Sequence, residues 1–118
     1  HTEIGFNYRM SNLLAALGLS DAFEVLITPG DVAAGKPAPD MYLAVCDRLH
    51  LAPRECVALE DSVAGIRSAV AAGVACIAVP TYLTLAAVRR ARIIDDRWVV
   101  ADPARLDAVF DQRVAAAH

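Results

Sequence analysis

Short apolar runs alternate along this chain with segments of helical periodicity, and this alternation constrains the fold more than any other feature. The runs are too short for helices and are typical of strands buried on both faces of a sheet. We predict strands at residues 23–28, 56–59, 74–79 and 98–101, and helices at about 8–17, 39–49, 62–72, 84–92 and 104–117. Helices between such strands favour a parallel sheet covered on both faces.

The predicted fold class is therefore α/β: a three-layer, Rossmann-like half domain with a parallel sheet of about four strands and helices on both faces. Ser62 is placed to cap the helix that follows it, and Gly73 to end that helix. A chain of 118 residues is long enough for one hydrophobic core. Sheets of this kind place ligands at the carboxyl ends of their strands, so functional residues are expected there.

The composition argues against several partners. The net charge is −3 and the basic residues are scattered, so we expect neither a nucleic-acid nor a membrane partner. No apolar run approaches the roughly 20 residues that cross a bilayer, and no signal-peptide pattern opens the chain, which favours a cytoplasmic protein. Cys46, Cys56 and Cys76 lie in apolar contexts without a C-x-x-C pair, so we expect buried free thiols.

Lys36 is the first candidate for chemistry. It lies in the segment Gly-Lys-Pro-Ala-Pro-Asp after the strand predicted at 23–28, and it is the only lysine in a chain whose other ten basic residues are arginine. A compact ammonium on a flexible stem can neutralise a phosphate oxygen and a neighbouring carboxylate at once. The alternative is a solvated lysine on a turn rich in Gly and Pro.

The second candidate is the acidic pair Glu60 and Asp61, which follows the strand predicted at 56–59. Adjacent carboxylates at the mouth of a sheet repel each other, and Mg²⁺, bound through one or two carboxylates and water, relieves that repulsion. The alternative is that Asp61 or Ser62 only caps the next helix while Glu60 is solvated. The presence of Lys36 one strand away favours the metal-binding interpretation.

Residues 30–36 also have the spacing of a nucleotide-binding P-loop. That motif requires Ser or Thr directly after its lysine, to hold magnesium. Pro37 stands there instead, and it offers neither a hydroxyl nor a backbone N–H group. We therefore reject the P-loop interpretation.

The stretch from Leu13 to Pro80 resembles the haloacid-dehalogenase-like hydrolases, in the branch similar to beta-phosphoglucomutase and phosphoglycolate phosphatase. The resemblance rests on GKPAPD and EDSVAGIRSAVAAG at their mutual spacing. In that family an aspartate attacks phosphorus and a second aspartate two residues on acts as acid and base. A lysine steadies the charge, and a late acidic pair holds magnesium. The resemblance implies catalytic and phosphate-binding roles for Lys36, and Mg²⁺ binding by Glu60 and Asp61.

Two parts of the family pattern are absent from these residues: the hhhDxDGT segment that carries the nucleophile, and the cap domain that usually follows it. Asp95 and Asp96 lack the D-x-D spacing. Thr2 lies close to the place of the phosphate-binding Ser or Thr, but its neighbours do not match. The resemblance therefore implies an enzyme that is incomplete without further residues.

Residues 3–19 separately resemble a segment of the pyridoxal-phosphate-dependent sugar aminotransferases, although Lys36 is in the wrong context for an internal aldimine. We accordingly divide the chain into a segment of unclear origin at 1–12 and the carboxyl-terminal part of a haloacid-dehalogenase-like core domain at 13–118. His1 in place of Met suggests processing or a fragment.

The leading functional hypothesis is a magnesium-dependent phosphohydrolase or phosphomutase segment acting on small phosphorylated metabolites, inactive alone. It would be completed by an amino-terminal half. The alternatives are a non-catalytic half-domain and a remnant of a sugar aminotransferase. Exposed edges or faces of a half sheet also favour a homodimer.

Overall fold

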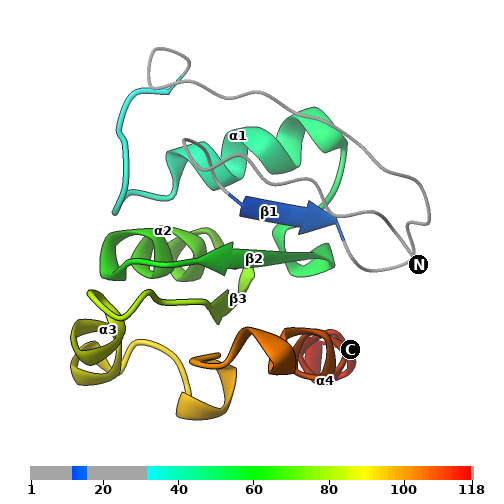
Figure 1. The fold of residues 1–118 in the computed structure, drawn as a ribbon. Coiled ribbons are helices and arrows are strands. Elements are labelled where there is room, and N and C mark those ends of the chain that lie inside the picture. The colour runs from blue at the N-terminus through cyan, green and yellow to red at the C-terminus, as the bar shows by residue number, and fades with distance from the viewer. Residues whose placement is uncertain (1–11, 16–31, 118) are drawn as a thin grey trace.

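The computed structural model describes residues 12–15 and 32–117 (Figure 1). The strands are β1 (Asn12–Ala15), β2 (Cys56–Glu60) and β3 (Ala75–Ala78). The α-helices are α1 (Asp40–Leu49), α2 (Val63–Ala72), α3 (Leu85–Ala91) and α4 (Leu106–Ala117), and short 3-10 helices occupy Pro53–Glu55, Asp96–Trp98 and Pro103–Arg105. From α1 onward, the predicted order of helices and strands is confirmed up to α3. No helix in the described part of the chain is long and apolar enough to span a membrane.

Within the described residues the sheet has three strands in the order β1-β2-β3. The central strand β2 is parallel to β3, with Val57 opposite Ala75 and Glu60 opposite Ala78. The strand predicted at 98–101 is reduced to a single parallel bridge between Ala78 and Val99. The parallel β2–β3 pair confirms the α/β class, while the strand predicted at 23–28 lies outside the described residues.

The helix predicted at 8–17 is wrong at Asn12–Ala15, because these residues form β1. They pair antiparallel with β2, so β1 is an antiparallel addition to the predicted parallel arrangement, which β2 and β3 form. The physical reason is that the free edge of β2 presents backbone N–H and C=O groups that need partners. A short apolar run such as Asn-Leu-Leu-Ala fits a strand as well as a helix, and its pairing decides between them.

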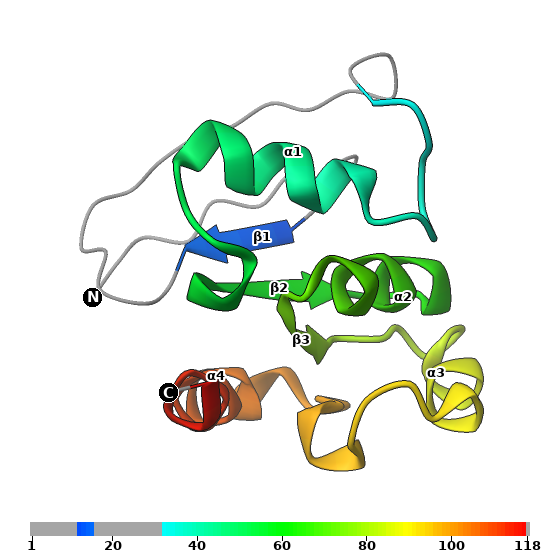
Figure 2. The ribbon, with the colours of Figure 1, turned by 180° about the vertical axis from the view of Figure 1, so that it is seen from behind.

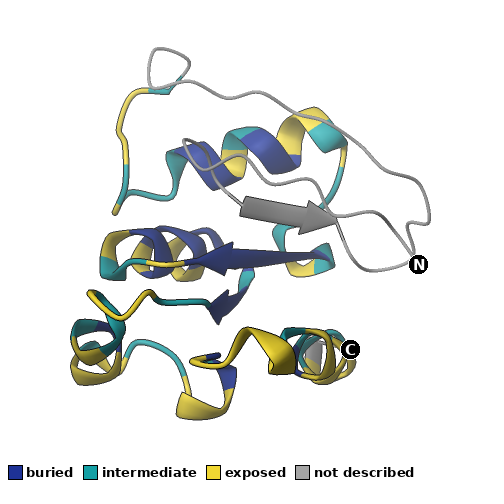
Figure 3. Ribbon diagram, viewed as in Figure 1, coloured by how far each residue is buried: buried dark blue, intermediate teal, exposed yellow. Residues whose placement is uncertain are grey.

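Helices cover both faces of the sheet, as predicted. In Figures 1 and 2, α1 and α4 lie at opposite ends of the molecule with the sheet between them. Alternate residues of β2 belong to two separate cores: Cys56 and Ala58 pack with α1 and α2, whereas Val57 and Leu59 pack with Trp98 and with Val109 of α4. Figure 3 shows β2 buried along its whole length. This burial explains why the strand is continuously apolar until Glu60.

The boundaries of α2 follow the predicted capping. The hydroxyl of Ser62 accepts a hydrogen bond from the N–H of Gly65 at 3.1 Å, which satisfies one of the free donors at the start of the helix. Gly73 ends the helix with φ of 82°, a left-handed conformation that glycine adopts without a steric penalty. These two residues fix the point at which the chain leaves β2 and returns toward β3.

Candidate phosphate and metal site at the end of β2

The structure brings Lys36 and Glu60 into direct contact. Lys36 lies in the loop before α1, and Glu60 is the last residue of β2, 24 positions further along the chain. The lysine Nζ donates to both carboxylate oxygens of Glu60, at 3.0 Å to Oε1 and 2.8 Å to Oε2. The side chain of Glu60 is only 2% exposed, whereas that of Lys36 is 25% exposed. The ammonium therefore joins a buried carboxylate to the surface of the protein.

Tyr42 is a second partner of Glu60 that the sequence did not reveal. Its side chain is fully buried in the first turns of α1, and its hydroxyl donates a hydrogen bond to Oε2 of Glu60. The ammonium of Lys36 also lies 5.9 Å from the centre of the Tyr42 ring. A buried carboxylate is costly unless its oxygens are hydrogen-bonded, and Lys36 and Tyr42 together meet that requirement.

Gly65 makes room for the carboxylate of Glu60. A Cβ atom at position 65 would lie 1.9 Å from Oε1 of Glu60, so the carboxylate could not keep its position beside any larger residue. The signal in the sequence was a glycine in the first turn of a helix. Glycine is unfavourable there unless another group packs closely against the helix backbone. In the sequence Gly65 stands out only as part of the segment EDSVAGIRSAVAAG, and its close approach to Glu60 is the physical reason for it.

The loop that carries Lys36 is held by contacts to the two neighbouring helices. The N–H of Ala34 donates to Oδ2 of Asp40 at 3.1 Å, at the start of α1. The buried hydroxyl of Ser68, on α2, donates to the carbonyl of Ala38 at 2.6 Å. One contact lies two residues before Lys36 and the other lies two residues after it. The loop therefore presents Lys36 to Glu60 from a supported backbone.

Asp61 differs from Glu60 in its surroundings although the two residues are adjacent. Glu60 points into the protein, where Lys36 and Tyr42 hold its oxygens, whereas Asp61 is exposed at the point where β2 ends and α2 is about to begin. Among the described residues no group of three or more His, Cys, Asp or Glu side chains is gathered as a complete metal site. A cation here would need oxygen ligands beyond these two carboxylates.

The other residues considered in the sequence do not belong to this site. Asp95 accepts a hydrogen bond from the N–H of Arg97 at 3.0 Å, and Asp96 lies 3.6 Å from Arg89, so both acidic residues join surface contacts. Lys36 is followed by a turn and no helix begins before Asp40, unlike the helix that should follow a P-loop. Thr2 lies outside the described residues.

A family model described as haloacid dehalogenase-like hydrolase matches residues 5–73. The protein YhcW of Bacillus subtilis (strain 168) is 44% identical over 75 residues, which cover 64% of this chain and 34% of YhcW. Hexitol phosphatase A of Escherichia coli (strain K12) is 52% identical over 56 residues, which cover 48% of this chain and 26% of that enzyme. The matched part of the chain thus spans about a third or less of each of these relatives.

Among solved structures, this chain is similar to CbbY from Rhodobacter sphaeroides in complex with phosphate. The TM-score is 0.44 and the sequence identity is 39%, over 54% of this chain and 25% of CbbY. The family match includes Lys36 and most of residues 3–19. The separate similarity of residues 3–19 to sugar aminotransferases finds no support in these relatives.

Proposed function

This chain belongs to the haloacid dehalogenase-like hydrolases, and from that premise we propose that it forms the phosphate- and metal-binding part of a magnesium-dependent phosphohydrolase or phosphomutase. The substrates of this enzyme are small phosphorylated metabolites. The observation that carries the proposal is the contact of 2.8 Å between the ammonium of Lys36 and the buried carboxylate of Glu60 at the carboxyl end of a parallel strand.

Lys36 is the residue proposed to contact the phosphate. Its ammonium has three donors, and Glu60 fixes its position while leaving part of the side chain exposed. Because the ammonium is already held in place, it does not need to move when an anion binds. Charges fixed in advance in this way are a main source of electrostatic stabilisation in phosphoryl transfer. Tyr42 and Gly65 act indirectly, because they position the carboxylate that positions Lys36.

Asp61 and Glu60 are the residues proposed to hold Mg²⁺, and the carboxylate of Asp61 is the exposed one of the two. Magnesium is bound through one or two carboxylates together with waters and phosphate oxygens, and this donor set suits such a site. With Lys36 protonated and both carboxylates ionised, the three side chains carry a net charge of −1, which a divalent cation would change to +1. When bound, the ion would supply positive charge to the phosphate, in addition to the positive charge of Lys36.

The attacking group is proposed to come from residues beyond those that form this site. The D-x-D motif of the family does not occur in the 118 residues, and the chain matches only part of its relatives. An amino-terminal half, in the same or another polypeptide, would place an aspartate near Lys36. The cap that distinguishes substrates in this family would be supplied with it, and a second copy of this chain is a further proposed partner.

Isothermal titration calorimetry with inorganic phosphate tests the binding part of the proposal. We expect Mg²⁺ to tighten phosphate binding and Asp61→Asn to remove that dependence. Lys36→Gln should weaken phosphate binding about tenfold or more, the loss expected for one charge-assisted hydrogen bond. Arg67→Gln changes an exposed charge on α2 and serves as the control. Equal phosphate affinity in the wild type and Lys36→Gln would exclude the proposed phosphate site.

Hydrolysis of para-nitrophenyl phosphate tests the catalytic part. The 118-residue chain alone should leave this substrate intact, whereas a longer chain that begins with a D-x-D segment should hydrolyse it in a reaction that requires Mg²⁺. Asp61→Asn in that longer chain should abolish the reaction. Turnover that is insensitive both to Asp61→Asn and to removal of Mg²⁺ would refute the assignment.

A further inference from the structure

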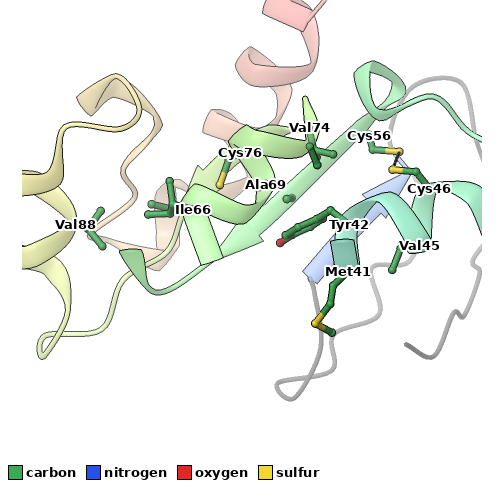
Figure 4. Packing of buried hydrophobic residues seen from close by; sticks show 13 residues of the cluster. Met41, Tyr42, Val45, Cys46, Cys56, Ile66, Ala69, Val74, Cys76 and Val88 are labelled. Carbon is green, nitrogen blue, oxygen red and sulfur yellow. Dashed lines mark hydrogen bonds between the residues drawn. The ribbon is translucent and has the colours of Figure 1, made fainter. Parts of the chain in front are cut away.

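We propose that Cys46 and Cys56 are a site of reversible oxidation, at which hydrogen peroxide converts the two thiols into an intrachain disulfide. The two Sγ atoms lie 4.0 Å apart, and both cysteines are free and buried. Figure 4 shows their sulfur atoms facing each other between α1 and the start of β2. A disulfide bond is about 2.05 Å long, so the sulfur atoms must approach each other by about 2 Å.

The two thiols differ in a way that sets the order of the reaction. The hydrogen bond between them lowers the pKa of Cys46, and the same hydrogen bond together with burial raises the pKa of Cys56. Cys46 is therefore the thiol of this pair that ionises first. The thiolate is the form that reacts with peroxide. The S–H of Cys56 is directed at the carbonyl of Ala52, which lies 3.7 Å from its Sγ.

The reaction proceeds in two balanced steps. The thiolate of Cys46 attacks one oxygen of hydrogen peroxide, the O–O bond breaks, and a sulfenic acid and hydroxide form. The sulfur of Cys56 then attacks the sulfenic sulfur, the S–O bond breaks, and the hydroxyl group leaves with the thiol proton as water. In total, two thiols give up two electrons and two protons to one peroxide, which becomes two waters. A dithiol reductant reverses the oxidation.

The third cysteine provides a natural comparison within the same core. Cys76 is on β3, and burial raises its pKa to about 12. Its thiol thus stays protonated at physiological pH and reacts slowly with peroxide. Burial is shared by all three cysteines, so the proximity of a second sulfur is what distinguishes Cys46 and Cys56.

The position of the pair links it to the rest of α1 and β2. Cys46 is one helical turn from Tyr42, and Cys56 points to the same face of β2 as Glu60, four residues later. The sulfur pair at the start of β2 and the hydrogen bond from Tyr42 to Glu60 at its end both connect α1 to this strand. A disulfide would make the first of these contacts covalent.

Peptide mapping of the wild-type chain tests the proposal directly. The folded, reduced chain is treated with a small excess of hydrogen peroxide, remaining thiols are alkylated under denaturing conditions, and the chain is digested with trypsin without reduction. The arginines separate the three cysteines into peptides 10–48, 55–67 and 68–89, with the Lys36–Pro37 bond resistant to trypsin. We expect peptides 10–48 and 55–67 to be joined, peptide 68–89 to be alkylated, and dithiothreitol to separate the joined pair.

Three single variants provide the matched comparison. Cys76→Ala should still lose two thiols and form the linked peptides, whereas Cys46→Ala and Cys56→Ala should form none. If either of the latter fails to fold, the wild-type map decides alone. The joined peptides must come from a species with the mass of one chain. Linkage through Cys76, linkage only between chains, peroxide-stable thiols, or sulfinic acid on Cys46 without a linked peptide would each overturn the proposal.

Discussion

The two faces of the sheet are built from the same three strands and differ in what they bury. The face toward α1 and α2 contains Glu60 and Ser68 among its apolar residues, and each of these polar side chains is hydrogen-bonded. The face toward α4 buries only apolar side chains within the described residues: Val57, Leu59, Ile77, Trp98, Val100 and Val109. The first face therefore holds polar groups in fixed positions, and the second contributes mainly apolar burial.

This difference follows from the alternation along β2. Residues at positions 56, 58 and 60 point to one face, and those at 57 and 59 to the other. Glu60 is thus buried on the α1–α2 face, next to the loop that carries Lys36. Changes on the α4 face should alter the free energy of unfolding and leave the contacts of Glu60 intact, whereas changes on the α1–α2 face should alter both stability and phosphate binding.

Trp98→Ala should produce the largest loss of stability. Trp98 is almost fully buried on the α4 face, and its removal leaves a large cavity. We expect the free energy of unfolding to fall by about 3–5 kcal/mol, measured by urea denaturation. Phosphate affinity should stay at the wild-type value when it is measured under conditions in which the variant is folded. A folded variant with lost phosphate binding would break the proposed division between the faces.

Gly65→Ala should give the second-largest loss of stability, and it affects the α1–α2 face. The added Cβ would displace the carboxylate of Glu60, because it would lie 1.9 Å from Oε1. Overpacking of this kind costs about 1–3 kcal/mol, and the displaced carboxylate should release Lys36 and weaken phosphate binding. Gly35→Ala is the matched control for stability, since a Cβ at that position would have no neighbour within 4 Å. Equal stability of the two alanine variants would contradict this explanation of Gly65.

The sequence predicted the α/β class because its signals for β2, α2 and β3 are local. A continuous apolar run, a capping serine and a terminal glycine each act within a few residues of their own position. The identity of β1 could not be predicted in this way. Whether Asn12–Ala15 becomes a helix or a strand depends on the backbone of β2, some 40 residues away, and periodicity within the segment carries no information about that partner.

The contact between Lys36 and Glu60 was predictable because both residues are unusual in their context. A lone lysine and an acidic residue at the end of an apolar strand stand out in this sequence. Tyr42 did not stand out, because an aromatic residue in an amphipathic helix is expected in the core whether or not its hydroxyl has a partner. Similarly, the proximity of Cys46 and Cys56 arises from the packing of α1 on β2, which spacing along the chain does not reveal.

Tyr42→Phe should have a smaller effect than Gly65→Ala, again on the α1–α2 face. It removes only the hydroxyl that donates to Oε2 of Glu60 and keeps the ring packed. We expect a loss of about 1.5 kcal/mol, near the lower end for a hydrogen bond to a charged group, measured by urea denaturation. Tyr82→Phe is the control, because Tyr82 is 91% exposed and should tolerate the loss of its hydroxyl. If the two variants are equally stable, the hydrogen bond of Tyr42 contributes nothing measurable.

Arg97→Ala should give the smallest loss of stability. It removes a surface side chain that lies over Trp98 on the α4 face. The guanidinium of Arg97 lies 4.4 Å from the centre of the Trp98 ring, and that of Arg113 lies 4.8 Å from it. At an exposed site such a cation–π contact contributes about 0.5–1 kcal/mol, so the variant should unfold at a slightly lower urea concentration. Arg67→Ala removes an exposed arginine from α2 and should change stability less. In the background of Trp98→Ala the effect of Arg97→Ala should become smaller, because the ring is then absent and only the exposed ion pair of Arg97 with Asp95 remains.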